Sequence, residues 1–188
     1  MEGGNKMRAL GQEYMNTEAS TGGDFQRLPA GGYVCKITKV EDHGNEEKPY
    51  LRVVYDIFEG DYAQYYSDDW GKENEWAHDM RQYYTPAAFG IFKGFLKAVD
   101  ISNGTAFEAA AETGLDERKM VGLLIGLIIG EEEYRSNDGS VRTRLRVRGA
   151  RPVQNIRDGK FKQPELKTLP DEEPIPLAPA LDEGDLPF

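Results

Sequence analysis

The feature that most constrains the fold is a strict alternation of arginine with apolar or β-branched residues from Val141 to Arg148. Side chains alternate between the two faces of a β-strand, so this period predicts a strand with one charged face and one core face. The expected core face carries Val141, Thr143, Leu145 and Val147. The charged face carries Arg142, Arg144, Arg146 and Arg148.

This strand is expected to be half of a hairpin. Asn137-Asp138-Gly139 lies between the runs 122–135 and 141–153, which are both typical of strands. Asn, Asp and Gly tolerate positive φ, as tight hairpin turns require. We therefore expect these runs to be the last two strands of the domain.

Two earlier runs, 33–40 and 50–58, are rich in β-branched and aromatic residues and predict strands that pair through the polar loop 43–48. In the second run, one face is expected to hold Leu51, Val53, Tyr55 and Ile57. The other face would hold Tyr50, Arg52, Val54, Asp56 and Phe58.

A helical insert is expected between the two strand pairs. Thr85-Pro86 is typical of a helix start, as N-cap and first-turn proline. Thr105 with Glu108 forms a capping-box pattern for a second short helix, and 116–121 adds a further turn. The apolar face of the first helix is expected to hold Phe89, Phe92, Leu96 and Val99.

These elements predict a mainly β domain, a five-stranded Greek-key barrel with a helical insertion. Residues 1–24 are expected to form a flexible N-terminal arm, residues 25–163 the barrel domain, and residues 164–188 a disordered acidic tail. The tail holds six of the ten prolines, and its seven acids are opposed by Lys167 alone, so it has little to bury.

Charge is segregated along the chain. The net charge of −10 argues against a nucleic-acid partner, yet residues 134–162 hold nine bases against Asp138 and Asp158. One cysteine and two histidines cannot build a disulfide framework or an ordinary zinc site. The longest apolar stretch, 121–129, is too short to span a bilayer, and we expect a cytoplasmic protein without membrane contact, cofactor or metal.

The arginine row suggests contact with a phosphate chain. Alternate residues on a strand are about 7 Å apart, near the phosphate spacing of an extended single strand. Arginine also stacks on bases. The alternative is a solvated edge strand whose arginines pair with Glu131, Glu132 and Glu133 across the hairpin.

Ten aromatic residues between positions 50 and 84 lie among polar neighbours, so several rings are expected at the surface, where unpaired bases can stack. The candidates for DNA contact are Tyr50, Trp70 and Trp76, with Arg52 beside them. The alternative is that Tyr55 and both tryptophans belong to the core.

The C-terminus combines acidic residues with an apolar tip. Its pattern suits a hook whose ring fills a partner's pocket and whose carboxylate meets a basic side chain. A plain acidic tail is the alternative. The candidate partner-binding residues are Asp182, Glu183, Asp185, Leu186, Pro187 and Phe188.

This tip resembles that of bacterial and phage single-stranded DNA-binding proteins, which typically runs acid-acid-acid-Ile-Pro-Phe; Leu186 stands for Ile, and Gly184 interrupts the acids. The stretch from Leu28 to Phe58, the helix around 92–95 and the closing hairpin also look like a phage family of small proteins found among replication genes. The resemblance implies an oligonucleotide-binding (OB) barrel that binds DNA on its sheet face and recruits replication or recombination enzymes through the tail.

The sequence thus predicts a non-enzymatic protein that coats single-stranded DNA in phage-type replication or recombination, and it leaves a homo-oligomer open. No phosphate-binding loop or nucleophile elbow is found, and no catalytic residues are assigned. One alternative is an accessory protein that mainly binds a protein partner. Another is a metal-dependent nuclease using Asp68, Asp69, Glu73 and Glu75.

Overall fold

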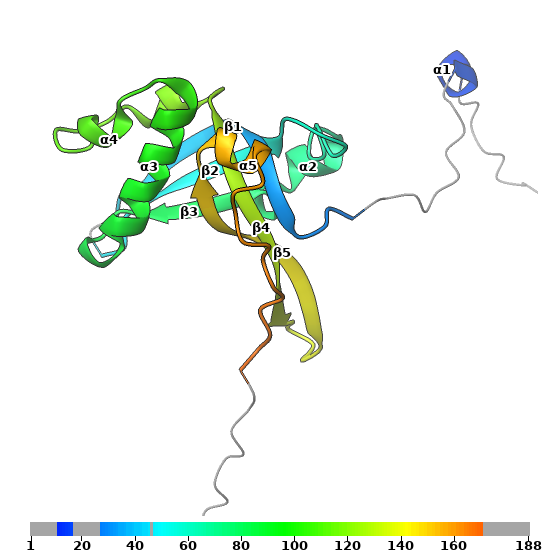
Figure 1. Ribbon diagram of the computed structural model, residues 1–188. Helices are drawn as coiled ribbons and strands as arrows, with labels where there is room; N and C mark the ends of the chain where they lie inside the picture. Colours follow the sequence, from blue (N-terminus) through cyan, green and yellow to red (C-terminus); the bar gives the residue numbers. More distant parts are fainter. Residues whose placement is uncertain (1–10, 17–26, 46, 171–188) are drawn as a thin grey trace, which may run out of the picture.

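The computed structural model describes residues 11–16, 27–45 and 47–170. Five strands and one long helix make up most of the domain (Figure 1). The strands are β1 (Gly31–His43), β2 (Tyr50–Ile57), β3 (Asp79–Tyr83), β4 (Leu124–Arg135) and β5 (Val141–Arg151). The α-helices are α1 (Gly11–Asn16), α2 (Asp69–Glu73), α3 (Phe89–Asn103), α4 (Phe107–Ala110) and α5 (Val153–Arg157), with 3-10 turns η1 (Glu75–Ala77), η2 (Pro86–Ala88) and η3 (Glu117–Met120).

The five strands form one antiparallel sheet in the order β3-β2-β1-β4-β5. A mainly β fold with five strands and a helical insert is therefore confirmed. The closed barrel is not: the sheet is open, with β3 and β5 as its edges. Helix α3 contacts both edge strands, and its side chains help to fill the space between them.

Both expected strand pairs are present. Strands β1 and β2 pair across the predicted loop, with a register shift between Ile37 and Lys39. Strands β4 and β5 pair across the predicted turn, where Gly139 has a φ of 81°. The predicted core face of β2 is confirmed, because Leu51, Val53, Tyr55 and Ile57 are all buried in one cluster.

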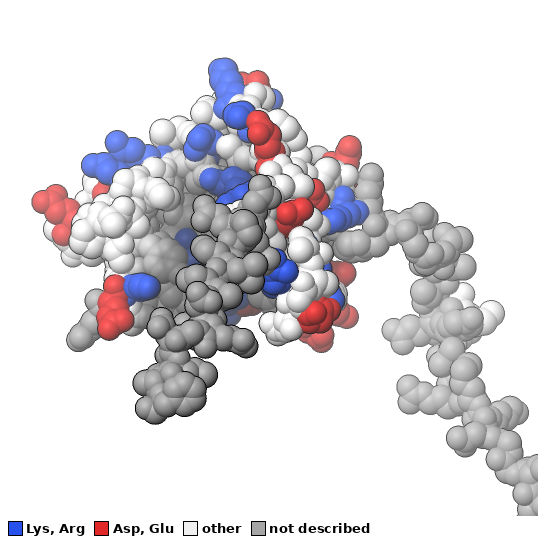
Figure 2. Space-filling model, turned by 90° about the horizontal axis from the view of Figure 1, so that it is seen from below, with Lys and Arg blue, Asp and Glu red and all other residues white. Residues whose placement is uncertain are grey.

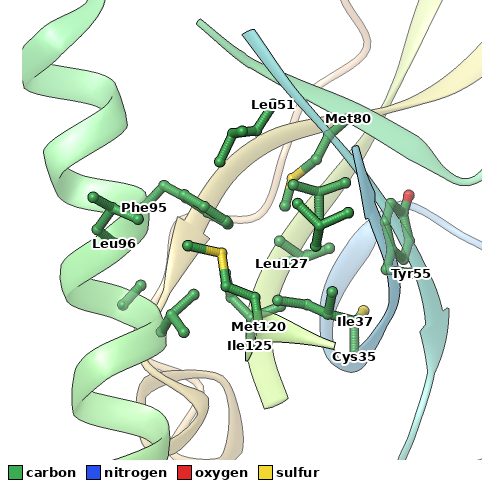
Figure 3. Packing of buried hydrophobic residues seen from close by; sticks show 14 of the residues in the cluster. Cys35, Ile37, Leu51, Tyr55, Met80, Phe95, Leu96, Met120, Ile125 and Leu127 are labelled. Atoms are coloured by element: carbon green, nitrogen blue, oxygen red, sulfur yellow. The ribbon is translucent and has the colours of Figure 1, made fainter. Parts of the chain in front are cut away.

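The core lies between the sheet and α3. Figure 3 shows Phe95 and Leu96 of α3 pointing toward Met120, Ile125 and Leu127. One expectation for this helix is wrong: Phe89 is 54% exposed. The α-helix begins only at Phe89, and Pro86 is the first residue of the preceding 3-10 turn η2.

The predicted capping box of the second helix is also wrong. Instead, the Asp100 carboxylate of α3 accepts hydrogen bonds from the backbone N–H groups of Phe107 and Glu108 at 2.7 and 2.9 Å, and from the Thr105 hydroxyl at 2.7 Å. The cap of α4 thus comes from the preceding helix.

Strand β4 is buried on both faces. Ile125, Leu127 and Ile129 join the main core. On the opposite face, Ile128 packs with Val34 of β1 and with Val153 and Ile156 of α5 in a second cluster, against which Phe161 packs. The chain after β5 therefore folds back across the outer face of β1 and β4.

The far half of the β4–β5 hairpin extends beyond the sheet (Figure 1). Strand β1 pairs with β4 only as far as Ile129, whereas β4 and β5 remain paired to Arg135. We call residues 130–146 the arm. Leu145 packs against the core as predicted, but Val141 and Thr143 are exposed, because no core lies under the end of the arm.

Within the described part of the chain, no helix is long and apolar enough to cross a membrane.

The close approach of α5 to β4 predicts a contrast between two Gly→Ala substitutions. A Cβ at Gly126 would lie 2.5 Å from Ile156 Cγ1 and 2.8 Å from the Arg151 carbonyl oxygen. Gly126→Ala is therefore expected to lower the free energy of unfolding by about 1–3 kcal/mol. Gly94→Ala, at an exposed α3 position with open space, is expected to raise it by roughly 0.5–1 kcal/mol.

Urea unfolding of the two variants and the wild type measures both effects. Equal stability of Gly126→Ala and the wild type would contradict the packing of α5 on β4.

Candidate nucleic-acid interface

A row of rings lies on the outer face of strands β1, β2 and β3. His43 stacks on Tyr50 with 4.9 Å between ring centroids and a 9° interplanar angle, and Tyr83 follows at 5.2 Å from Tyr50. The Arg81 guanidinium lies 5.2 Å from the centroid of the Tyr50 ring. This surface, which we call the aromatic row, offers flat rings and a cation to a ligand with both aromatic and anionic parts.

Arg52, two residues after Tyr50 on the same face of β2, is enclosed by carboxylates. Its guanidinium donates to Asp79 at 2.8 Å and to Glu41 and Glu75 at 2.9 Å each, and its side chain is 20% exposed. Lys39 also pairs with Glu75 at 3.2 Å. Arg52 thus links three segments of the chain, and its charge is already balanced within the fold.

The arginine row of β5 shares one carboxylate on β4. Arg144 lies 2.7 Å from the Glu132 carboxylate, Arg148 3.2 Å and Arg146 3.8 Å. Burial acts to raise the pKa of Glu132, but the Arg144 hydrogen bond and the charges of Arg144 and Arg148 outweigh it and hold that pKa below its ordinary value. The cross-hairpin pairing foreseen as the alternative therefore exists, with three guanidiniums on one carboxylate.

The ends of the row have further partners. Arg142, at the tip of the arm, pairs with Asp138 at 2.7 Å and donates to Ser140 Oγ. Arg146 comes within 4.0 Å of Asp79 on β3, which brings the two edges of the sheet close together. Arg144 also lies 4.9 Å over the Tyr134 ring.

Charges of both signs alternate over the face that Figure 2 shows. Phosphates approaching the arm would meet guanidiniums whose positions are already held by carboxylates. Such partly exposed pairs add little to stability, so they leave the arginines able to exchange partners.

Both predicted tryptophans are at the surface. Trp70 of α2 is 49% exposed and Trp76 of η1 is 64% exposed, with their rings in edge contact at 6.3 Å. Trp76 Nε1 donates to Asn74 Oδ1 at 3.0 Å, which fixes its ring. The core alternative holds for Tyr55, which is 2% exposed, but not for the tryptophans.

Part of the sheet's outer face is covered. The Phe161 ring lies over Gly32 of β1, where a Cβ would come within 2.5 Å of it. Pro164 lies over Gly130 of β4, where a Cβ would come within 3.0 Å of it. Lys167, which the sequence assigned to the tail, forms a parallel bridge to Glu132, so the chain also runs along the arm. The open outer surface therefore includes the aromatic row, whereas part of the arm is covered.

The carboxylates considered for a metal have separate roles. Asp68 caps α2 by accepting from Gly71 N, Asp69 pairs with Lys72, and Glu75 pairs with Lys39 and Arg52. Among the described residues, no group of three His, Cys, Asp or Glu side chains could hold a metal ion.

Sequence reasoning missed β3 and with it Arg81, and it counted Tyr83 only as one of the ten aromatic residues. The signal was present: Asp79, Arg81 and Tyr83 alternate with Met80 and Gln82, which are buried. The candidate tip residues from Asp182 to Phe188 lie outside the described part of the chain.

No protein-family model matches the sequence, and no curated protein matches it.

The shared carboxylate predicts a pH-dependent effect of Glu132→Gln. A lowered pKa in the folded state means that Glu132 stabilises the fold above its unfolded-state pKa, near 4.3, and that this contribution disappears as the pH falls through the folded-state pKa. At pH 7 the variant is expected to be less stable by up to about 1 kcal/mol. The difference should shrink below pH 4.

Denaturant unfolding of both proteins at pH 7, 5 and 3 measures it. Glu112→Gln, at an exposed position beyond α4, is the matched control. A difference that grows toward pH 3 would contradict the assigned role of Glu132.

Proposed function

We propose that the protein binds single-stranded DNA through the aromatic row and the arm. Two observations support this most: a run of stacked rings with Arg81 beside Tyr50, and an arginine row on a two-stranded projection. Stacked bases and tracked phosphates are the two requirements of sequence-tolerant single-strand binding.

The topology supports an OB-like interpretation. An OB-fold is a five-stranded, partly open Greek-key barrel that binds oligonucleotides on strands 2 and 3 and on the loops joining strands 1–2 and 4–5. Here the aromatic row lies on β2 and β3, His43 ends β1 beside the first loop, and the arm carries the last loop. We propose that the sheet is an OB-like barrel left open between β3 and β5.

The ionic pairs fit a binding surface that is preorganised. Glu132 holds three guanidiniums within 4 Å, and phosphates can join or replace it without first ordering those side chains. Trp70 and Trp76 extend the stacking surface, whereas Arg52 is expected to position Asp79 and Glu75 more than to contact DNA directly.

The proposal extends to the role of the protein in the cell. The protein would coat unpaired DNA during phage-type replication or recombination in the cytoplasm, and its tip from Asp182 to Phe188 would recruit a partner enzyme. A mainly protein-binding accessory role is the second candidate, supported by the exposed apolar side chains of Phe89, Ile91 and Ile101 on α3.

Removing two arginines of the row tests the proposal. Arg144→Gln with Arg146→Gln is expected to weaken binding to oligo-dT and to lower the slope of log affinity against log salt by about 1.4, at roughly 0.7 per lost phosphate contact. Neutral replacements are preferable to reversed charges, which would repel Glu132 and distort the arm.

Fluorescence anisotropy from 50 to 400 mM salt measures both quantities. The matched control, Lys97→Gln with Arg118→Gln, removes two exposed cations from α3 and η3. An unchanged slope in the first variant, or an equal loss in the control, would contradict the assignment of the arm.

Deleting residues 181–188 is expected to leave oligo-dT affinity equal or higher. The tail's acids attract the basic stretch 134–162, which would also meet phosphate, so removing part of the acidic charge lessens this competition. Any gain should vanish near 1 M salt, where the Debye length is about 3 Å. Anisotropy titrations of the full chain and the truncation measure this, and weaker binding by the truncation at every salt concentration would contradict it.

A further inference from the structure

A groove of about 520 Å³ separates the two edges of the sheet. Strand β3 forms one wall and β5 the other, while η2 contributes Ala88 and α3 contributes Ile91 and Phe95. The groove opens beside the surface proposed to bind DNA, because Trp76, Tyr83 and Arg146 line it as well.

Gln82 on β3 is the unusual group in this groove. Its side chain lines the groove although the residue is only 9% exposed. Its Nε2 lies 3.5 Å from Met80 Sδ, and its Oε1 is buried with no hydrogen-bond partner. It is the one buried side-chain nitrogen or oxygen without a partner among residues 11–16, 27–45 and 47–170. Such an atom lowers stability unless a ligand supplies a donor.

The walls indicate what kind of ligand supplies that donor. Arg146 and Arg148 place cations on the β5 wall, and Trp76 and Tyr83 place rings at the β3 side. A ring to stack on, a cation for phosphate and an amide for the base edge are what proteins use to hold one unstacked base. An apolar peptide would offer no hydrogen-bond donor to the amide oxygen.

We propose that this groove receives one unstacked base of the bound strand. The Gln82 side chain would turn toward that base, so that Oε1, buried in the unbound protein, accepts a hydrogen bond from its exocyclic amino group. The inference rests on the proposed function and gives it a base preference. Adenine and cytosine present an amino donor where thymine and uracil present a carbonyl acceptor. An acceptor facing an acceptor forms no hydrogen bond, so bases with the amino group should be preferred.

Oligo-dC and oligo-dU of equal length test this with the full-length protein. They have the same ring size and lack the thymine methyl group, so they differ at the amino group that Gln82 is proposed to contact. The wild type is expected to bind oligo-dC roughly three- to tenfold more tightly, as one hydrogen bond provides. Gln82→Met should abolish this preference and leave oligo-dU affinity within about twofold of the wild type.

Two further variants separate recognition from folding. Gln154→Met, on α5, is the matched control and should keep the preference. Ala88→Phe, at a half-exposed position lining the groove, should narrow the groove and reduce the preference with Gln82 intact. The urea midpoint of Gln82→Met should be unchanged or higher, because that substitution removes the unpaired oxygen.

The outcomes distinguish the two proposals. No binding to either oligonucleotide would overturn the proposed function. Equal binding of oligo-dC and oligo-dU by the wild type, or a preference that survives in Gln82→Met, would overturn the groove assignment alone. If Gln82→Met does not fold, a preference unchanged in Ala88→Phe overturns that assignment.

Discussion

Strand β4 is buried on both faces, and the two hydrophobic clusters of the domain lie on these two faces. One face packs with α3 in the main core, and the other packs with α5. The second contact requires strand positions without side chains, because a Cβ at Gly126 or Gly130 would meet Ile156 or Pro164. With β4 held this way, β5 and the arm are carried at a fixed place beyond the sheet, and the chain after β5 has a fixed route back across it.

The alternation of Val141–Arg148 placed the arginines on one face correctly, because strand period is a local property. The turn at Gly139 and the core face of β2 were predictable for the same reason. The point at which the core ends could not be predicted in this way. Val141 and Thr143 follow the alternating pattern, yet they are exposed because they lie beyond the core. The cap of α4 by Asp100 and the enclosure of Arg52 by Glu41, Glu75 and Asp79 arise from residues distant in sequence, which no local pattern marks.

The candidate site shows the same division. A strand of five residues with only Met80 and Gln82 inward carries a weak apolar signal, so β3 and Arg81 were missed. The covered part of the outer face was also missed, although glycines within strands often mark close approach of another segment. Gly32 and Gly130 are two such glycines, because Phe161 and Pro164 lie against them. They identify the part of the outer sheet face that the chain itself covers.

The bridge between Lys167 and Glu132 fixes where the C-terminal segment leaves the domain. That point lies at the same carboxylate that holds the arginine row, so the tail is tethered at the proposed DNA surface itself. From Pro170 the eighteen remaining residues can span at most roughly 60 Å, at about 3.4 Å per residue. A partner bound at Phe188, as proposed, would therefore contact this chain within that distance of Pro170, close to the proposed DNA surface.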